Sequence, residues 1–177
     1  MNRVIIMLTL FYVVLYGFLG YVLERVINLV FLGMWLDNSV LFLPVQPMYG
    51  LGVVGALLTH AWLKKLGLNK TIEITLLMIA SIFATALSEA VSGELYEMLY
   101  GTRLWDYGDT FSMCAYPYVC ALPTGLFGVL SGLAVLFVHP YIKAHTKASP
   151  RVFIMVVIGL VLIDFIFTYS ADFISLF

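Results

Sequence analysis

The sequence predicts an all-α, polytopic membrane protein in which five transmembrane helices form a single domain of residues 1–177. Hydrophobic residues make up 63% of the chain and charged residues only 11%, and the mean hydropathy is +1.04. An average soluble domain carries about 25% charged residues, and a water-soluble globule of this size could not bury so much apolar surface. The apolar residues also fall into stretches close to the roughly 20 residues that a helix needs to cross a bilayer.

Charged residues and prolines delimit these stretches. The predicted spans are about 4–31, 45–63, 71–100, 118–138 and 152–175. The first is uncharged from Arg3 to Glu24 and is too long for a signal peptide. The second ends before a lysine pair, the third starts after Lys70, and the fourth opens after Pro117 and closes at His139-Pro140.

Segments 24–55 and 94–130 resemble each other. Each begins with a glutamate and continues through a tryptophan and an aspartate to a proline segment and a glycine-rich helix. This similarity indicates two parallel helix hairpins followed by a fifth helix. The alternative is a chance similarity between two apolar hairpins.

The lysines and arginines give an orientation. Seven of them lie in the N-terminal segment and in the connections at 64–70 and 139–151, whereas the opposite face carries only Arg25 and Arg103. Short cytoplasmic loops of membrane proteins carry an excess of basic residues. We therefore expect the N-terminus inside and the C-terminus outside.

Carboxylates from different helices are predicted to lie near the outer boundary. Glu24 is 21 residues, roughly 31 Å, beyond Arg3, and Glu89 is 19 residues, roughly 28 Å, beyond Lys70. Glu97 follows on the same side. Ionisable groups at membrane depth usually face protein or water, where they pair or handle a ligand. We therefore expect one outward-facing charged cavity.

The candidate substrate-binding residues are Glu24, Glu89, Glu97, Arg103, Trp105, Asp106, Tyr49 and Gln46. Three roles for the glutamates stay open: Glu89 pairs with Arg25 or Arg103 and ties the hairpins together, a glutamate binds a ligand or metal, or the helix end is simply solvated. No His or Asp lies at recognisable ligand spacing, so we predict no metal site.

Pro47 and Pro123 are expected to begin the second and fourth helices at the outer face. Proline suits a first helical turn, and the exposed amides of a helix N-terminus attract anions. Beside Arg25 and Arg103, these two helix starts could hold a phosphate or carboxylate. The alternative is that the prolines only start helices and the nearby glycines only allow close packing.

Asp164 falls about 13 residues into the fifth span, near mid-bilayer. We favour a protonated side chain that is hydrogen-bonded to a neighbouring helix over a proton-carrying group. Cys114 and Cys120 lie six residues apart on the predicted outer face. A disulfide is possible there in an oxidising compartment, but we favour two free thiols.

Several familiar functional motifs are absent from the sequence. There is no Gly-x-x-x-x-Gly-Lys-Ser/Thr loop for ATP, no Gly-x-Ser-x-Gly elbow and no His-Glu-x-x-His zinc motif. An enzymatic role is therefore uncertain and lacks a named nucleophile, and we expect no cofactor. The net charge of −1 gives no reason to expect a nucleic-acid partner.

Several strings of residues point to a known family. They are Gly20-Tyr21-Val22-Leu23-Glu24, Leu43-Pro44-Val45-Gln46-Pro47-Met48-Tyr49-Gly50-Leu51-Gly52, the pair Glu89 and Glu97, and Arg103-Leu104-Trp105-Asp106-Tyr107. Together they resemble the CmpB-like "putative ABC-transporter type IV" family of small bacterial membrane proteins, over about residues 17–135. The chain departs from the family pattern at Tyr21, where tryptophan is usual, and lacks an arginine before the proline string. The resemblance implies a transport role in the bacterial cytoplasmic (inner) membrane.

Three functions are compatible with these features. The first is a transport or translocation component with an outward-facing charged cavity for a small polar or zwitterionic solute or a lipid headgroup. It would sit in the lipid bilayer and would need a separate ATPase, an ion gradient or a homo-oligomer. The second is a membrane-embedded enzyme that acts on a lipid-linked substrate with a carboxylate as general base. The third is a non-catalytic partner or assembly subunit.

Overall fold

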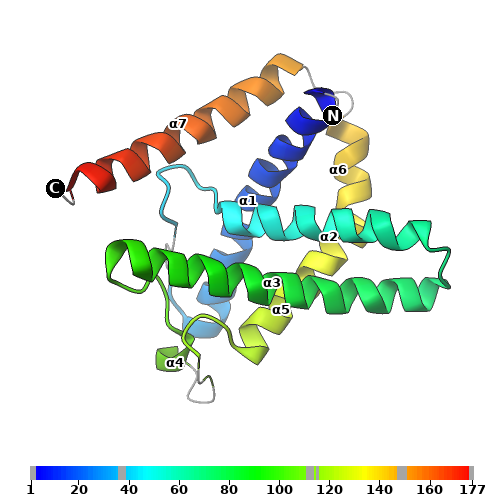
Figure 1. The fold of residues 1–177 in the computed structure, drawn as a ribbon, viewed down its shortest axis with the longest axis horizontal. Helices are drawn as coiled ribbons and strands as arrows, with labels where there is room; N and C mark the ends of the chain where they lie inside the picture. The colour runs from blue at the N-terminus through cyan, green and yellow to red at the C-terminus, as the bar shows by residue number, and fades with distance from the viewer. Residues whose placement is uncertain (1–2, 36–38, 111–113, 115, 147–150, 176–177) are drawn as a thin grey trace. The chain divides into compact units, whose positions relative to one another are not determined.

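The computed structural model describes residues 3–35, 39–110, 114, 116–146 and 151–175. All secondary structure in these residues is helical (Figure 1). The elements are α1 (Arg3–Leu32), α2 (Pro47–Lys65), α3 (Lys70–Tyr100), α4 (Tyr107–Thr110), α5 (Ala121–Leu133), the π-helical turn η1 (Ala134–Val138), α6 (His139–Thr146) and α7 (Arg151–Ser175). The all-α prediction is therefore confirmed for the part of the chain that the structure describes.

Four helical stretches in the described residues are long and apolar enough to cross a membrane. They are Val4–Val30, Lys70–Tyr100, Ala121–Thr146 and Arg151–Thr168. They correspond to the first, third, fourth and fifth predicted spans, so the prediction of a multi-pass membrane protein is confirmed. The helix α2 is not among them, and a count of five spans stays a prediction.

The helix that contains the fourth predicted span does not end at His139-Pro140 but continues to Thr146. Pro140 has no N–H and its ring crowds the carbonyl four residues earlier. The chain accommodates the proline with η1, where the His139 N–H donates to the Ala134 carbonyl five residues back. The helix is widened at this turn and is not broken.

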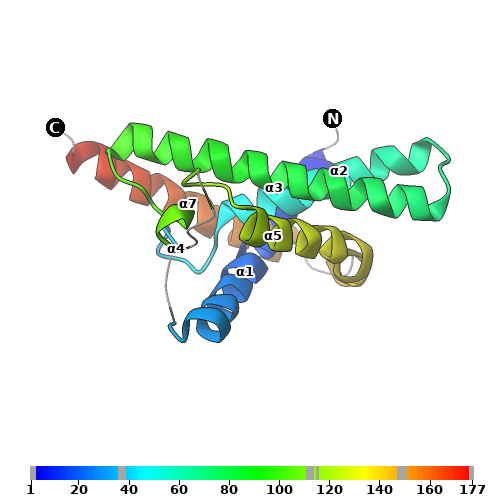
Figure 2. The same ribbon diagram turned by 90° about the horizontal axis from the view of Figure 1, so that it is seen from below.

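Local signals fix both ends of α3. The Asn69 side chain accepts hydrogen bonds from the Thr71 and Ile72 N–H groups at 2.9 and 3.2 Å, which caps the N-terminus. Gly101, with a φ of 69°, ends the helix because glycine adopts the left-handed conformation without a Cβ penalty. A short turn joins α2 to α3, and in both ribbon views the part of α2 from Gly52 onward runs beside α3 in the opposite direction (Figures 1 and 2).

Contacts divide the chain into two compact units. The first comprises Met1–Leu51 with His145–Phe177, and the second comprises Gly52–Ala144. In the first unit α1 packs against α7 through Phe11, Ile154 and Ile158, which are all buried. These contacts are apolar throughout, as expected for helices that meet inside a bilayer.

The segment between α1 and α2 turns back along α1 (Figure 1). The Gln46 N–H donates to the Gly17 carbonyl at 3.2 Å, and a Cβ at Gly50 would overlap the carbonyl oxygen of Val13. Gly17 is the central residue of the Val4–Val30 span, so α2 begins halfway along α1. The structure therefore places Pro47 beside the middle of α1, and a start of this helix at the outer face stays a prediction. Because glycine has no Cβ, Gly17 and Gly50 allow α1 and the start of α2 to approach each other closely.

In the second unit α5 packs against α3 through small residues. A Cβ at Gly128 would overlap the Cα of Ile82, and one at Gly132 would lie 2.5 Å from the Met78 sulfur. Gly128 and Gly132 are four residues apart and share one face of α5, a spacing that lets membrane helices approach closely. This contact sets the two helices side by side and positions the polar groups described next.

Candidate functional site

Glu89 is the buried carboxylate of the candidate site. Only 3% of the residue is exposed. Its Oε1 accepts a hydrogen bond from the Tyr107 hydroxyl at 2.9 Å, and its Oε2 accepts one from the Thr124 hydroxyl at 2.5 Å. Tyr107 comes from α4 and Thr124 from the first turn of α5, so one side chain of α3 connects three elements.

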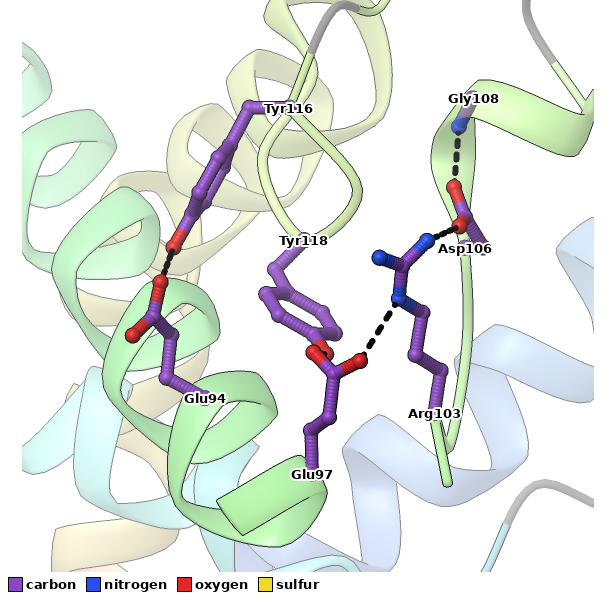
Figure 3. Close-up of polar contacts among 7 residues, drawn as sticks. All are labelled: Glu94, Glu97, Arg103, Asp106, Gly108, Tyr116 and Tyr118. Carbon is purple, nitrogen blue, oxygen red and sulfur yellow. Dashed lines mark hydrogen bonds and ion pairs between the residues drawn. The ribbon is translucent and has the colours of Figure 1, made fainter. Parts of the chain in front are cut away.

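Glu97, Arg103 and Asp106 form a charged cluster at the C-terminal end of α3 (Figure 3). The Arg103 Nε lies 3.1 Å from Glu97 Oε1, and the Arg103 Nη1 lies 2.5 Å from Asp106 Oδ2. The side chains of Arg103 and Glu97 are 47% and 40% exposed, whereas that of Asp106 is 15% exposed. Of these three residues, hereafter the Glu97–Arg103–Asp106 cluster, Arg103 and Glu97 are therefore exposed, whereas Asp106 is largely covered.

Tyrosine hydroxyls bind the glutamates of this helix end. Glu97 also accepts a hydrogen bond from the Tyr118 hydroxyl, and Glu94 accepts one from the Tyr116 hydroxyl at 2.6 Å (Figure 3). Gly93 leaves room for the Tyr118 ring, because a Cβ at this position would overlap the ring. A phenol is a neutral donor, so it satisfies a carboxylate without the cost of desolvating a second charge.

Arg103 and Tyr116 lie outside the spanning helices, and both have shifted pKa values. Hydrogen bonds to Asp106 and then to Glu97 raise the pKa of the Arg103 guanidinium. The hydrogen bond to Glu94, followed by burial, raises the pKa of the Tyr116 phenol above its ordinary 10.0. At neutral pH Arg103 is therefore a cation and Tyr116 a neutral hydrogen-bond donor.

The first unit contains the remaining candidate residues. The Tyr49 hydroxyl donates to Glu24 Oε2 at 3.0 Å, and the Tyr49 ring packs against Gly20, where a Cβ would overlap it. The Arg25 guanidinium lies 4.4 Å from the centroid of the Tyr21 ring, within the range of a cation–π contact. The Oε1 of Gln46 is buried and has no hydrogen-bond partner among the described residues.

The structure thus divides the eight candidates into two groups. Glu89, Glu97, Arg103, Trp105 and Asp106 gather in the second unit, whereas Glu24, Tyr49 and Gln46 gather in the first. Convergence of both groups on one cavity stays a prediction.

The structure bears on two of the alternatives left open for charge pairing and helix ends. Arg103 pairs with Glu97 and Asp106 and does not neutralise Glu89. The Thr124 hydroxyl, which accepts from the Cys120 N–H at 3.0 Å, directs the Glu89 carboxylate to the N-terminus of α5. A carboxylate of the protein itself thus lies at the first turn of α5, in agreement with the positive potential of a helix N-terminus.

The predictions for Asp164 and the cysteines also change. Asp164 is buried and accepts hydrogen bonds from the Phe42 and Leu43 N–H groups at 3.3 and 2.8 Å. The Thr168 hydroxyl of the same helix also donates to it at 3.3 Å, so these partners belong to a non-helical segment and to its own helix. Backbone that leaves a helix at membrane depth needs such a partner. Cys114 and Cys120 form a disulfide, so the expectation of two free thiols is wrong.

The sequence model of the family described as "Putative ABC-transporter type IV" matches residues 11–169. The chain belongs to this family. No curated protein and no solved structure matched the chain. The match extends over most of both units, and it confirms the resemblance to the CmpB-like proteins.

In this member of the putative ABC-transporter type IV family, the Arg-x-Trp-Asp-Tyr string holds the loop between α3 and α5 in place through hydrogen bonds. Arg103 binds Glu97, and the Trp105 Nε1 donates to the Tyr118 carbonyl at 3.3 Å. The Asp106 Oδ1 accepts from the Gly108 N–H at 2.7 Å, and the Tyr107 N–H donates to the Pro117 carbonyl at 2.7 Å. Each residue of the string therefore fixes the path of the loop between α3 and α5.

Sequence reasoning missed the partners of the glutamates in this family member. Tyr107, Tyr116, Tyr118 and Thr124 supply the hydroxyl donors. A buried tyrosine hydroxyl usually finds a hydrogen-bond partner. The grouping of three tyrosines in the segment that follows α3 was the available signal.

Proposed function

We propose that this protein is the membrane-spanning component of a transport or translocation system, and that the Glu97–Arg103–Asp106 cluster engages a small zwitterionic solute or a lipid headgroup. Glu97 would bind a cationic group and Arg103 an anionic one. The single observation that carries this proposal is the solvent exposure of an acid and a base in contact at the end of a spanning helix, with side chains 40% and 47% exposed.

The contact between the two partners of such an exposed ion pair is easily replaced by contacts with a charged ligand. Exposed ion pairs contribute little to stability, so a ligand that carries both charges can replace the internal contact at small cost. Glu89 differs because it is buried and bonded to two hydroxyl groups. In this proposal Glu89 positions the loop, and the exposed cluster meets the ligand.

The proposed orientation has the N-terminus inside, the C-terminus outside and α2 as the fifth span. The basic connections support it. The disulfide between Cys114 and Cys120 gives further support, because disulfides persist in oxidising compartments such as the bacterial periplasm. The Glu97–Arg103–Asp106 cluster lies close to this disulfide in sequence and would then face the same compartment.

Transport requires an energy source, and the chain carries no P-loop motif. We infer that a separate ATPase, an ion gradient or assembly into a homo-oligomer drives the process. Family membership favours the ATPase, because the matching family is described as a putative ABC-transporter type. Co-purification of the full chain from its native membrane would identify such a subunit.

A thermal-shift screen of the purified protein tests the binding role. The probes are amino acids, phosphocholine and phosphoethanolamine, because a ligand that binds only the folded state raises its stability. A probe that binds the cluster should raise the melting temperature of the wild type but not of Glu97→Gln or Arg103→Gln. Arg151→Gln, which removes an arginine elsewhere, is the matched control and should respond as the wild type does.

A second function, a non-catalytic assembly subunit, is favoured by a different observation. Glu24, Glu89, Glu94 and Glu97 each accept a hydrogen bond from a tyrosine of the same unit. Such contacts could serve only to lock the helices together. If Glu97→Gln and Arg103→Gln fold normally and keep full cellular function, the assembly role becomes the better account.

A further inference from the structure

A cavity of about 420 Å³ in the second unit is lined by basic side chains. They are His60, Lys64, Lys70, His139 and Lys143. Three helices contribute them, α2, α3 and α6, and no acidic residue lines the cavity in the described part of the chain. The cavity is separate from the Glu97–Arg103–Asp106 cluster, because Lys70 and Glu97 lie near opposite ends of α3.

The nearest carboxylate leaves two of the lysines available. Glu73 Oε1 lies 2.9 Å from the Lys70 Nζ and 2.8 Å from the His60 Nε2. The ammonium groups of Lys64 and Lys143 have no hydrogen bond or ion pair within the described residues. Two cations from different helices therefore face a shared space without an internal anion.

The rest of the cavity wall is apolar. Leu57 and Ile74 line it together with Val135, Leu136 and Phe137 of η1, and Phe137 is 72% exposed. The π-helical turn is the one departure from α-helical geometry inside a spanning helix of the described chain, and such turns are rare and frequent at functional sites. The helix is thus distorted at the place where it lines the cavity.

The cavity lies at the ends of two candidate membrane spans, where lipid headgroups are expected. Lys70 begins the Lys70–Tyr100 span, and His139 and Lys143 lie in the last two turns of the Ala121–Thr146 span. Basic pockets between spanning helices at a membrane face bind the headgroups of anionic lipids. An apolar wall beside the cations fits an acyl chain and is of no use to a small free anion.

We propose that this cavity binds an anionic phospholipid, with its phosphate held by Lys64 and Lys143 and an acyl chain along the wall that Leu57 and Phe137 help to form. The ammonium groups contribute charge-assisted hydrogen bonds to phosphate oxygens. This site does not depend on the solute proposed for the Glu97–Arg103–Asp106 cluster.

Native mass spectrometry of the full chain tests this proposal with phosphatidylglycerol as the probe. The double variant Lys64→Gln/Lys143→Gln removes two lining charges, and Lys65→Gln/Arg151→Gln removes two basic charges that do not line the cavity. At the typical contribution of one basic residue near a membrane surface, the first variant should bind phosphatidylglycerol roughly 30-fold more weakly. The control variant should bind it as the wild type does.

Two further ligands test whether the bound phosphate group belongs to a phospholipid or to free inorganic phosphate. Phosphatidylcholine should bind less well than phosphatidylglycerol because its choline group cancels the charge, and inorganic phosphate should compete poorly because it lacks an acyl chain. Equal weakening in both double variants, or none in either, would overturn the site. Inorganic phosphate that displaces phosphatidylglycerol at equal concentration would overturn the assignment to a lipid.

Discussion

The hydroxyl of Thr124 donates a 2.5 Å hydrogen bond to Oε2 of Glu89, and this contact joins the first turn of α5 to α3. Both residues are buried, with 2% and 3% of their surfaces exposed. The residues are 35 positions apart in the sequence, so the contact exists only because the two helices pack side by side. It anchors the loop that carries the Glu97–Arg103–Asp106 cluster.

Replacement of Thr124 by valine should destabilise the protein by about 1–3 kcal/mol, because it leaves one buried carboxylate oxygen and the Cys120 N–H without this partner. Thermal unfolding in detergent measures the change. Thr85→Val is the matched control, since the Thr85 hydroxyl bonds only to the Ser81 carbonyl of its own helix, and it should cost less than about 0.5 kcal/mol. Equal losses in the two variants would contradict the role given to Thr124.

Gly128→Ala should be destabilising, because the added Cβ would overlap the Cα of Ile82 and lie 2.9 Å from its nitrogen. Backbone atoms cannot turn away as a side chain can, so α5 must shift, at a cost of roughly 1–3 kcal/mol. Gly125→Ala provides the control on the same helix, where a Cβ meets nothing within 4 Å. That variant should be neutral or up to about 1 kcal/mol more stable, and the two melting temperatures should diverge.

Asp164→Ala should loosen the segment between α1 and α2. The Phe42 and Leu43 N–H groups lose their acceptor, at roughly 1–3 kcal/mol for each N–H left unpaired. Hydrogen exchange of residues 42–46, followed by mass spectrometry, should become faster. Ser170→Ala removes a hydroxyl that bonds within α7 and should leave this exchange unchanged, whereas unchanged exchange in Asp164→Ala itself would remove the aspartate from this role.

The Tyr116 phenol should titrate above pH 10, because its hydrogen bond to Glu94 raises the folded-state pKa. A raised pKa for an acid means that the folded state holds the proton more tightly. The stabilisation is therefore complete below pH 10 and is lost as the pH rises through the folded-state value. Carbon-13 NMR of labelled tyrosines, with Tyr116→Phe for assignment, measures it, and Glu94→Gln should lower the pKa towards 10.

The disulfide offers a test of orientation. If Cys114 and Cys120 face the oxidising compartment, a membrane-impermeant maleimide should label intact cells only after they are treated with an impermeant reductant. The chain has 2 cysteines, so any labelling reports on this pair. Labelling without reduction, or only after cell lysis, would refute the outward placement of this loop.

The sequence by itself determined the apolar helical stretches that are long enough to cross a membrane. Long apolar stretches, the capping residue Asn69 and the left-handed Gly101 act over one helix or one turn, so composition and spacing predict them. The grouping of Glu97, Arg103 and Asp106 was also predictable, because these residues are within nine positions of one another.

Only the tertiary structure decided which polar groups meet across helices. The partners of Glu89 include Thr124, those of Asp164 lie more than 120 positions away at Phe42 and Leu43, and α2 begins beside Gly17 and not at the end of α1. In a soluble protein the hydrophobic pattern of a helix indicates which face is buried. Inside a bilayer every face of the helix is apolar, so the pattern does not indicate which face contacts another helix. Small residues such as Gly128 and the need to satisfy every buried polar group select the packing, and both act between residues distant in the chain.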